Sequence, residues 1–180
     1  MGLFNFIKKK ISLEDYAELL LEALIDLEKR ILQDFLHRTF ECDVEDEALK
    51  YEVRIFSLWL ITLRIPSEKL RDILHDTFCT SIGANQEVKE MFYQDIDRRY
   101  RNYFTAYNMW IKNPQNGHMI GTAIIETMKN LNPNFSLEKG PLPLIGAMEA
   151  HKGFLFFTST FELSLKMIGF IKDKYTVEGL

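Results

Sequence analysis

Residues 51–63 read YEVRIFSLWLITL, and this stretch decides how the rest of the chain is interpreted. From Ile55 onward nearly every side chain is apolar, so a helix formed here has no side suited to water and is expected to be buried all round. Asp43 is a suitable residue to start this helix, and Pro66 ends it because proline has no amide hydrogen for the helical ladder. We therefore expect a buried central helix over 44–65.

The segments around this helix have the spacing of amphipathic helices. Ser12 offers a cap, with Asp15 in the capping-box position, and apolar residues then recur three and four positions apart over 12–40: Leu13, Tyr16, Leu20, Leu24, Leu27, Ile31 and Phe35. Beyond the central helix, Gly83 suits the end of a helix over 66–82, and Asn85 suits the start of a helix over 85–112. Because the connections are short, we expect an all-α (mainly α) antiparallel helical bundle of four long helices.

The C-terminal part is richer in glycine and proline. A turn cluster at 113–117 marks a soft boundary, after which we expect helices over 117–131 and 144–151 with a loop between them. Residues 153–171 fit both a helical stripe and, around 154–168, a short β element; we favour the helix because of its length and scarce β-branching. The prediction is one domain: a mobile or membrane-touching segment (1–11), the helical bundle (12–112) and a C-terminal part packing on it (113–180).

Composition excludes several classes of protein. Hydrophobic residues make up 47% of the 180 residues and charged residues 27%, which is ordinary for a globular protein and excludes wholesale disorder. Two cysteines cannot form a disulfide scaffold. The net charge of −4 argues against a general nucleic-acid coat, so nucleic acid is not an expected partner. The charge is uneven, since residues 12–50 contain 12 acidic and 4 basic residues while residues 1–11 contain three lysines and no acid.

The N-terminus reads MGLFNFIKKK and is a candidate membrane contact. Its basic cluster follows a short apolar stretch, the reverse of a secretory signal, so we expect a cytoplasmic location with membrane association as an alternative. The proposed contact residues are four apolar side chains that would enter lipid and three lysines that would meet anionic headgroups: Leu3, Phe4, Phe6, Ile7, Lys8, Lys9 and Lys10. The alternative is a frayed terminus whose apolar residues pack on the body. Residues 153–171 are long enough to span a bilayer, but Glu162 and Lys166 near the middle argue against a span.

Aromatic residues gather on one face of the helix expected at 85–112. The candidate ligand- or partner-binding residues there are Tyr93, Tyr100, Tyr103, Tyr107 and Trp110. Arg98 and Arg101 project from other faces, unlike the mixed surface that binds single-stranded nucleic acid. The simplest interpretation is an aromatic core face, but the tyrosine hydroxyls need partners if they are buried, and a pocket for a small apolar or aromatic ligand would supply them.

No motif for catalysis or metal binding stands out. His75 and Cys79 lie one turn apart, and His37 and Cys42 lie near a predicted helix end, but neither pair has the compact spacing of a zinc site. No glutamate is followed by histidine three positions later, as a helical di-iron site needs. We therefore predict no metal, no cofactor and no catalytic residues. The expected function is a non-enzymatic intracellular interaction or adaptor protein, whose candidate partners include a second copy of the chain. The alternatives are a small-molecule-binding helical protein and a peripheral membrane protein using residues 1–10.

Overall fold

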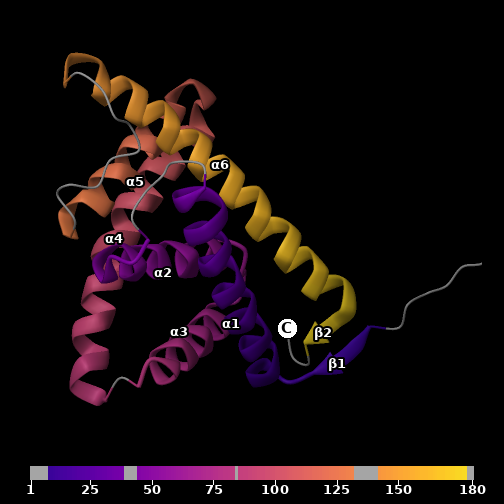
Figure 1. Cartoon of the computed structure of the whole chain (residues 1–180). Helices are drawn as coiled ribbons and strands as arrows, with labels where there is room; N and C mark the ends of the chain where they lie inside the picture. Colours follow the sequence, from indigo (N-terminus) through magenta and orange to yellow (C-terminus); the bar gives the residue numbers. More distant parts are fainter. Residues whose placement is uncertain (1–7, 39–43, 84, 132–141, 178–180) are drawn as a thin grey trace, which may run out of the picture.

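The computed structural model describes residues 8–38, 44–83, 85–131 and 142–177 and shows a mainly α-helical protein with one short parallel strand pair (Figure 1). The elements are β1 (Lys9–Ile11), α1 (Leu13–Arg30), the π-helical η1 (Ile31–His37), α2 (Glu47–Thr62), α3 (Glu68–Ser81), α4 (Gln86–Lys112), the short 3₁₀ turn η2 (Pro114–Asn116), α5 (Gly117–Leu131), α6 (Leu142–Lys174) and β2 (Tyr175–Val177). The predicted mainly α helical bundle is confirmed.

Helix α2 lies at the centre, as its sequence predicts. All residues from Ile55 to Thr62 are buried, and α1, α4, α5 and α6 all pack against α2. The axis of α2 runs across that of α1 in Figure 1. The residue that caps α2 is Asp46, whose carboxylate accepts a hydrogen bond from the amide of Leu49 at 3.0 Å; the predicted start, Asp43, lies outside the described residues. The all-round apolar sequence of α2 therefore matches its all-round burial.

The other helix ends follow ordinary capping chemistry. Ser12 and Asn85 accept hydrogen bonds from the amides of Asp15 and Val88, as predicted, and Gly83 has the positive φ of 70° that favours glycine after a helix. The start of α3 differs slightly from expectation, because Ser67 is the cap and Pro66 lies just before it. The first predicted helix is not α-helical throughout. Its regular α-helix stops at Arg30, and the π-helix η1 continues it to His37.

The C-terminal part is built on one long helix. Residues 142–174 form α6, so the helical interpretation of 153–171 is confirmed and the β alternative around 154–168 is wrong. The physical reason is a stripe of buried residues with helical spacing that faces the core: Phe156, Phe157, Thr160, Ser164 and Ile168. Strand structure occurs elsewhere, where β1 and β2 pair in parallel with Lys9 opposite Tyr175.

Helices α5 and α6 cross in close backbone contact. A Cβ built on Gly153 would lie 2.6 Å from the carbonyl oxygen of Gly121, and one built on Gly121 would collide with the carbonyl oxygen of Ala150. Two glycines facing each other let the helix backbones approach more closely than any larger side chains would permit. This crossing joins the C-terminal part to the bundle, because α5 also packs on α4.

Candidate functional site

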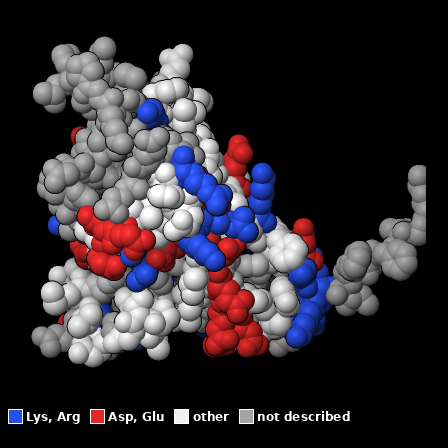
Figure 2. Space-filling model, in the orientation of Figure 1, with Lys and Arg blue, Asp and Glu red and all other residues white. Residues whose placement is uncertain are grey.

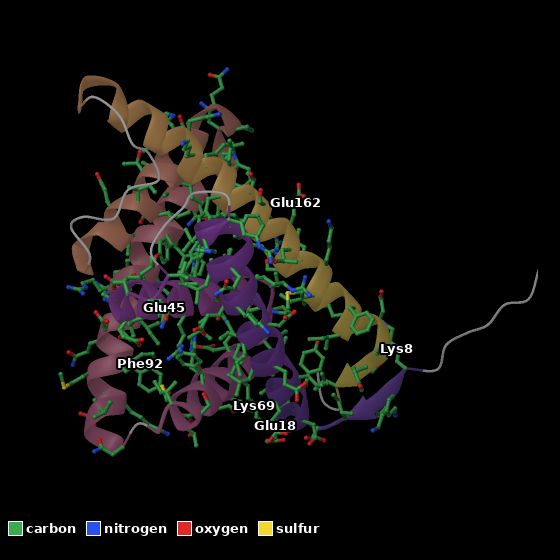
Figure 3. All side chains as sticks on the ribbon, viewed as in Figure 1. Lys8, Glu18, Glu45, Lys69, Phe92 and Glu162 are labelled. Carbon is green, nitrogen blue, oxygen red and sulfur yellow. The ribbon has the colours of Figure 1, made fainter. Side chains whose placement is uncertain are left out.

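The strand pair creates a basic corner at one end of the molecule. Because β1 and β2 are parallel and in register, the lysines before α1 lie beside the end of α6. We define the basic corner by its five exposed lysines: Lys8, Lys9, Lys10, Lys172 and Lys174. Figure 2 shows basic atoms gathered at this corner, and Figure 3 shows Lys8 where β1 begins, near the end of α6. The N-terminal cluster seen in the sequence is thus enlarged by lysines from the other end of the chain.

Acidic side chains and an exposed aromatic ring surround the basic corner. Exposed Asp173 lies between its two C-terminal lysines, and the exposed acids Glu14 and Asp15 begin α1. Figure 2 shows the acidic groups on the lower part of α1, next to the basic corner. The side chain of Phe170 is 61% exposed, and the ammonium of Lys174 lies 3.9 Å from the centre of its ring. The corner therefore combines cations with an exposed aromatic ring, which suits an anionic surface with an apolar interior.

The seven predicted membrane-contact residues divide into two groups. Lys8, Lys9 and Lys10 are exposed at the basic corner. Leu3, Phe4, Phe6 and Ile7 lie outside the described residues. Their role in membrane contact stays a prediction, but the structure places the lysines that follow them.

Helix α6 is also relevant to membrane contact. Within the part of the chain that the structure describes, Ala150–Lys174 is the one helix long and apolar enough to cross a bilayer, and about a third of its most apolar stretch is buried. Its outer face alternates apolar and polar groups, since Leu155 and Leu165 are 48% and 39% exposed while Glu162 points away from the body (Figure 3). Lys166 is exposed on the same side. Charges on this face disfavour a span in contact with lipid tails on all sides.

Four of the five aromatic residues predicted to bind a ligand pack against other rings, which come from α2, α3, α4 and α6. Tyr100 and Tyr103 are buried, and the ring of Tyr103 lies 4.9 Å from that of Trp59 in α2. Tyr107 and Trp110 are half-buried and contact the ring of Phe157. An aromatic cluster of this kind fills space that a pocket would occupy. The sequence left both interpretations open, an aromatic core face and a ligand pocket. Binding by these residues stays a prediction.

Two of these tyrosines satisfy their hydroxyls inside the protein. The Tyr93 hydroxyl donates to Asp76 at 2.8 Å, and the Tyr100 hydroxyl lies 3.3 Å from Nε2 of His75 and 3.4 Å from Oγ1 of Thr62. Burial raises the pKa of both tyrosines and lowers the pKa of His75, so the three groups are neutral near pH 7. The hydroxyl of Tyr103 is buried and has no hydrogen-bond partner among the described residues.

A buried ion pair between α2 and α4 is the feature that the sequence did not reveal. The side chains of Glu52 and Arg99 are 0% and 3% exposed, and Nε of Arg99 donates to Oε1 of Glu52 at 2.6 Å. Arg99 also pairs with Asp95, which accepts a hydrogen bond from the hydroxyl of Tyr51 at 2.8 Å. The sequence contained only weak signs of this ion pair. Arg99 lies at the edge of the aromatic face, and Glu52 comes just before the fully apolar part of α2.

The electrostatics of this cluster follow from burial and pairing. Burial raises the pKa of Glu52, and the guanidinium of Arg99 opposes that rise without cancelling it. For Asp95, burial also acts upward, but the hydrogen bonds from Tyr51 and Arg99 outweigh it and hold the pKa below its ordinary value. The two carboxylates raise the pKa of Arg99 despite its burial, so it stays charged. All its described charged members have structural partners, so the cluster is a buried structural network.

The other residues considered for catalysis or metal binding do not form a site among the described residues. Cys79 is buried, and burial raises the pKa of its thiol, which favours the unreactive protonated form. His75 faces Tyr100, and Cys42 lies outside the described residues. Among the described residues, no group of three or more histidine, cysteine or acidic side chains is arranged to hold a metal ion.

Comparison of the chain with models of protein families, with curated protein sequences and with solved structures found no match.

Proposed function

We propose that this chain is a peripheral membrane protein whose basic corner binds an anionic lipid surface. The observation that supports the proposal is the β1–β2 register, which brings two groups of lysines to the same end of the molecule. Lys8, Lys9 and Lys10 come directly after an apolar sequence, and Lys172 and Lys174 lie at the end of α6. Neither end of the chain alone has this density of cations. The proposal selects the membrane alternative among the functions expected from the sequence.

The physical basis is that two weak signals act together. Each lysine close to an anionic bilayer contributes about 1 kcal/mol, and this attraction fades within a Debye length of about 8 Å at physiological salt. A fully buried phenylalanine or leucine side chain contributes about 1.5–3 kcal/mol. Neither signal anchors a protein stably by itself, because stable membrane anchoring takes two signals. Lysines beside an apolar segment supply both.

The experiment is co-sedimentation of the full chain with vesicles. Vesicles of phosphatidylcholine alone are compared with vesicles that contain phosphatidylserine, at low and physiological salt. We expect binding to the anionic vesicles only, weakening as salt increases. Replacing Lys9 and Lys10 by glutamine removes about 2 kcal/mol of attraction, which corresponds to about thirty-fold weaker binding.

The matched control replaces two exposed lysines elsewhere, Lys69 in α3 and Lys112 in α4, by glutamine. This control changes the net charge equally but leaves the basic corner intact. An equal loss of binding in both double variants, or no binding of the unmodified chain to anionic vesicles at low salt, contradicts the proposal.

A protein partner, self-association and a small-molecule ligand stay predictions. A groove between α4 and α5 has a volume of about 810 Å³, and residues outside the predicted aromatic set line it, including Asn102, Met109, His118 and Glu126. No described contact selects an occupant for it.

A further inference from the structure

A second groove runs between α1 and α6 and ends at the basic corner. Its volume is about 510 Å³, and Tyr175 of β2 lines it together with residues of both helices. Six of its twelve lining residues have apolar side chains, which we call its apolar floor: Leu19, Ala23, Leu163, Met167, Phe170 and Ile171. Figure 1 shows α1 and α6 diverging toward the strand pair, which closes the wider end. Phe170, 61% exposed, shows that part of this floor is uncovered by the described residues.

The register of the strand pair places the start of β1 at the end of this groove. Because β1 and β2 are parallel with Lys9 opposite Tyr175, Lys9 lies beside a residue that lines the groove, and residues 1–7 come shortly before it in the sequence. Seven extended residues span up to about 23–25 Å. The α6 wall from Lys174 back to Leu163 is about 17 Å long at 1.5 Å per residue. Residues 1–7 therefore have enough reach to cover the whole α6 wall.

The chemistry of residues 1–7 matches the groove. Their sequence, MGLFNFI, contains no charged side chain and four large apolar ones. Five charged side chains also line the groove, and all of them are exposed except the half-buried Asp26: Glu22, Asp26 and Arg30 on α1 and Lys166 and Lys174 on α6. Asp26 is already paired with Arg30. An uncharged apolar segment can therefore occupy the floor without burying a charge.

We propose that residues 1–7 dock into the groove between α1 and α6 of their own chain. The tether favours this occupant over a second copy, because a short connection gives an effective concentration of about 1 mM, far above that of free chains. A segment that would bind with a dissociation constant of about 1 mM if untethered is then docked half of the time. Docking covers Phe170 and withholds Phe4 and Phe6 from lipid. This consequence rests on the proposed membrane function, because the same side chains cannot occupy the groove and the bilayer together.

The test is photo-crosslinking without lipid. The full chain is made with p-benzoylphenylalanine in place of Phe6, and crosslinked peptides are identified by mass spectrometry. We expect crosslinks to the walls of the groove, within residues 19–30 and 163–175. A mixture of isotopically light and heavy chains distinguishes crosslinks within one chain from crosslinks between chains.

Two variants on α6 make the test specific. Phe170→Ser removes the exposed ring in the groove, whereas Leu165→Ser removes an exposed apolar side chain on the outer face of the same helix. We expect about a tenfold lower yield for Phe170→Ser, from the loss of one phenylalanine contact, and no change for Leu165→Ser. Both substitutions are at exposed positions, and urea unfolding checks that each variant is folded.

The outcomes separate docking from the proposed membrane function. Crosslinks between chains, crosslinks confined to other peptides, or a yield that Phe170→Ser leaves unchanged overturn the docking. Intramolecular crosslinks that decrease when phosphatidylserine vesicles are added support both docking and its release by lipid. If crosslinks persist on chains that have bound vesicles, docking holds and the competition with lipid is refuted. If vesicles do not bind at all, the membrane function fails while the lipid-free result still decides the docking.

Discussion

Replacing Arg99 by methionine isolates the energetic role of the buried ion pair. Methionine keeps most of the side-chain length but removes the only described cation bonded to Glu52, whose side chain is fully buried. Asp95 retains the hydroxyl of Tyr51 and the guanidinium of Arg98. The substitution therefore leaves Glu52 as the one buried carboxylate that has lost its described partner.

The size of the loss can be worked out from protonation. A buried carboxylate without a cation binds a proton rather than remaining charged. An ordinary glutamate has a pKa of about 4.3, so keeping it protonated at pH 7 costs about 3.7 kcal/mol, at 1.36 kcal/mol for each pKa unit. We expect the free energy of unfolding to fall by up to about 3–4 kcal/mol at pH 7, which lies within the range of about 3–5 kcal/mol for breaking a buried ion pair.

The loss of unfolding free energy should depend on pH, in a direction that follows from the pKa of Glu52. In the native chain the pKa of Glu52 is already raised by burial, and the loss of Arg99 raises it further. A carboxyl group with a higher pKa in the folded state destabilises the fold as pH rises above the unfolded value, and this penalty is absent below about pH 4.3. Because the native chain shares part of this penalty, the deficit of Arg99→Met should shrink by at most about 2.7 kcal/mol between pH 7 and pH 5. In the native chain Asp95 titrates below this window, because hydrogen bonds from Tyr51 and Arg99 lower its pKa.

Urea unfolding followed by circular dichroism measures the free energy at each pH. Arg101→Met is the matched control, because Arg101 lies on the same helix with an exposed pair to Asp97, and its effect should stay within about 0.5 kcal/mol. Adding Glu52→Gln to Arg99→Met should abolish the pH dependence. A deficit below about 1 kcal/mol that is flat between pH 5 and pH 7 would refute the reasoning, because it would mean that water solvates Glu52.

Other parts of the fold give further predictions. Gly153→Ala should lower the free energy of unfolding by more than about 3 kcal/mol, because its Cβ would collide with the carbonyl of Gly121; Gly169→Ala, with open space around its Cβ, should raise it by about 0.5–1 kcal/mol, and equal effects in urea unfolding would contradict the crossing. Asn85→Ala should lower it by about 1 kcal/mol by removing the acceptor for the amide of Val88, and Asn85→Gly should have a smaller effect; a negligible loss for alanine would show that the cap is not formed in solution. Binding to anionic vesicles should weaken steadily between low salt and 0.5 M salt, whereas binding that is insensitive to salt would argue against a role for the lysines.

Local patterns in the sequence were sufficient to predict the helices and many of their ends. Local spacing predicted the burial of α2, and short-range capping chemistry predicted Ser12, Gly83 and Asn85, because such contacts join residues only a few positions apart. Exposed pairs one turn apart, such as Asp26 with Arg30, were predictable for the same reason. The segment 153–171 was ambiguous, since its apolar pattern fits two periodicities and packing against α5 decides between them.

Which distant residues meet depends on the packing of the whole chain. Glu52 and Arg99 are 47 positions apart, and no local pattern showed that the edge of one helix face would meet the other. Lys9 and Tyr175 come from opposite ends of the chain, and their pairing created both the basic corner and the closed end of the groove beside it. Helix periodicity reports which side of a helix seeks the core, but the partner across the core depends on how all the helices pack together. The residues on which the proposed function depends are therefore visible in the sequence, and their meeting is not.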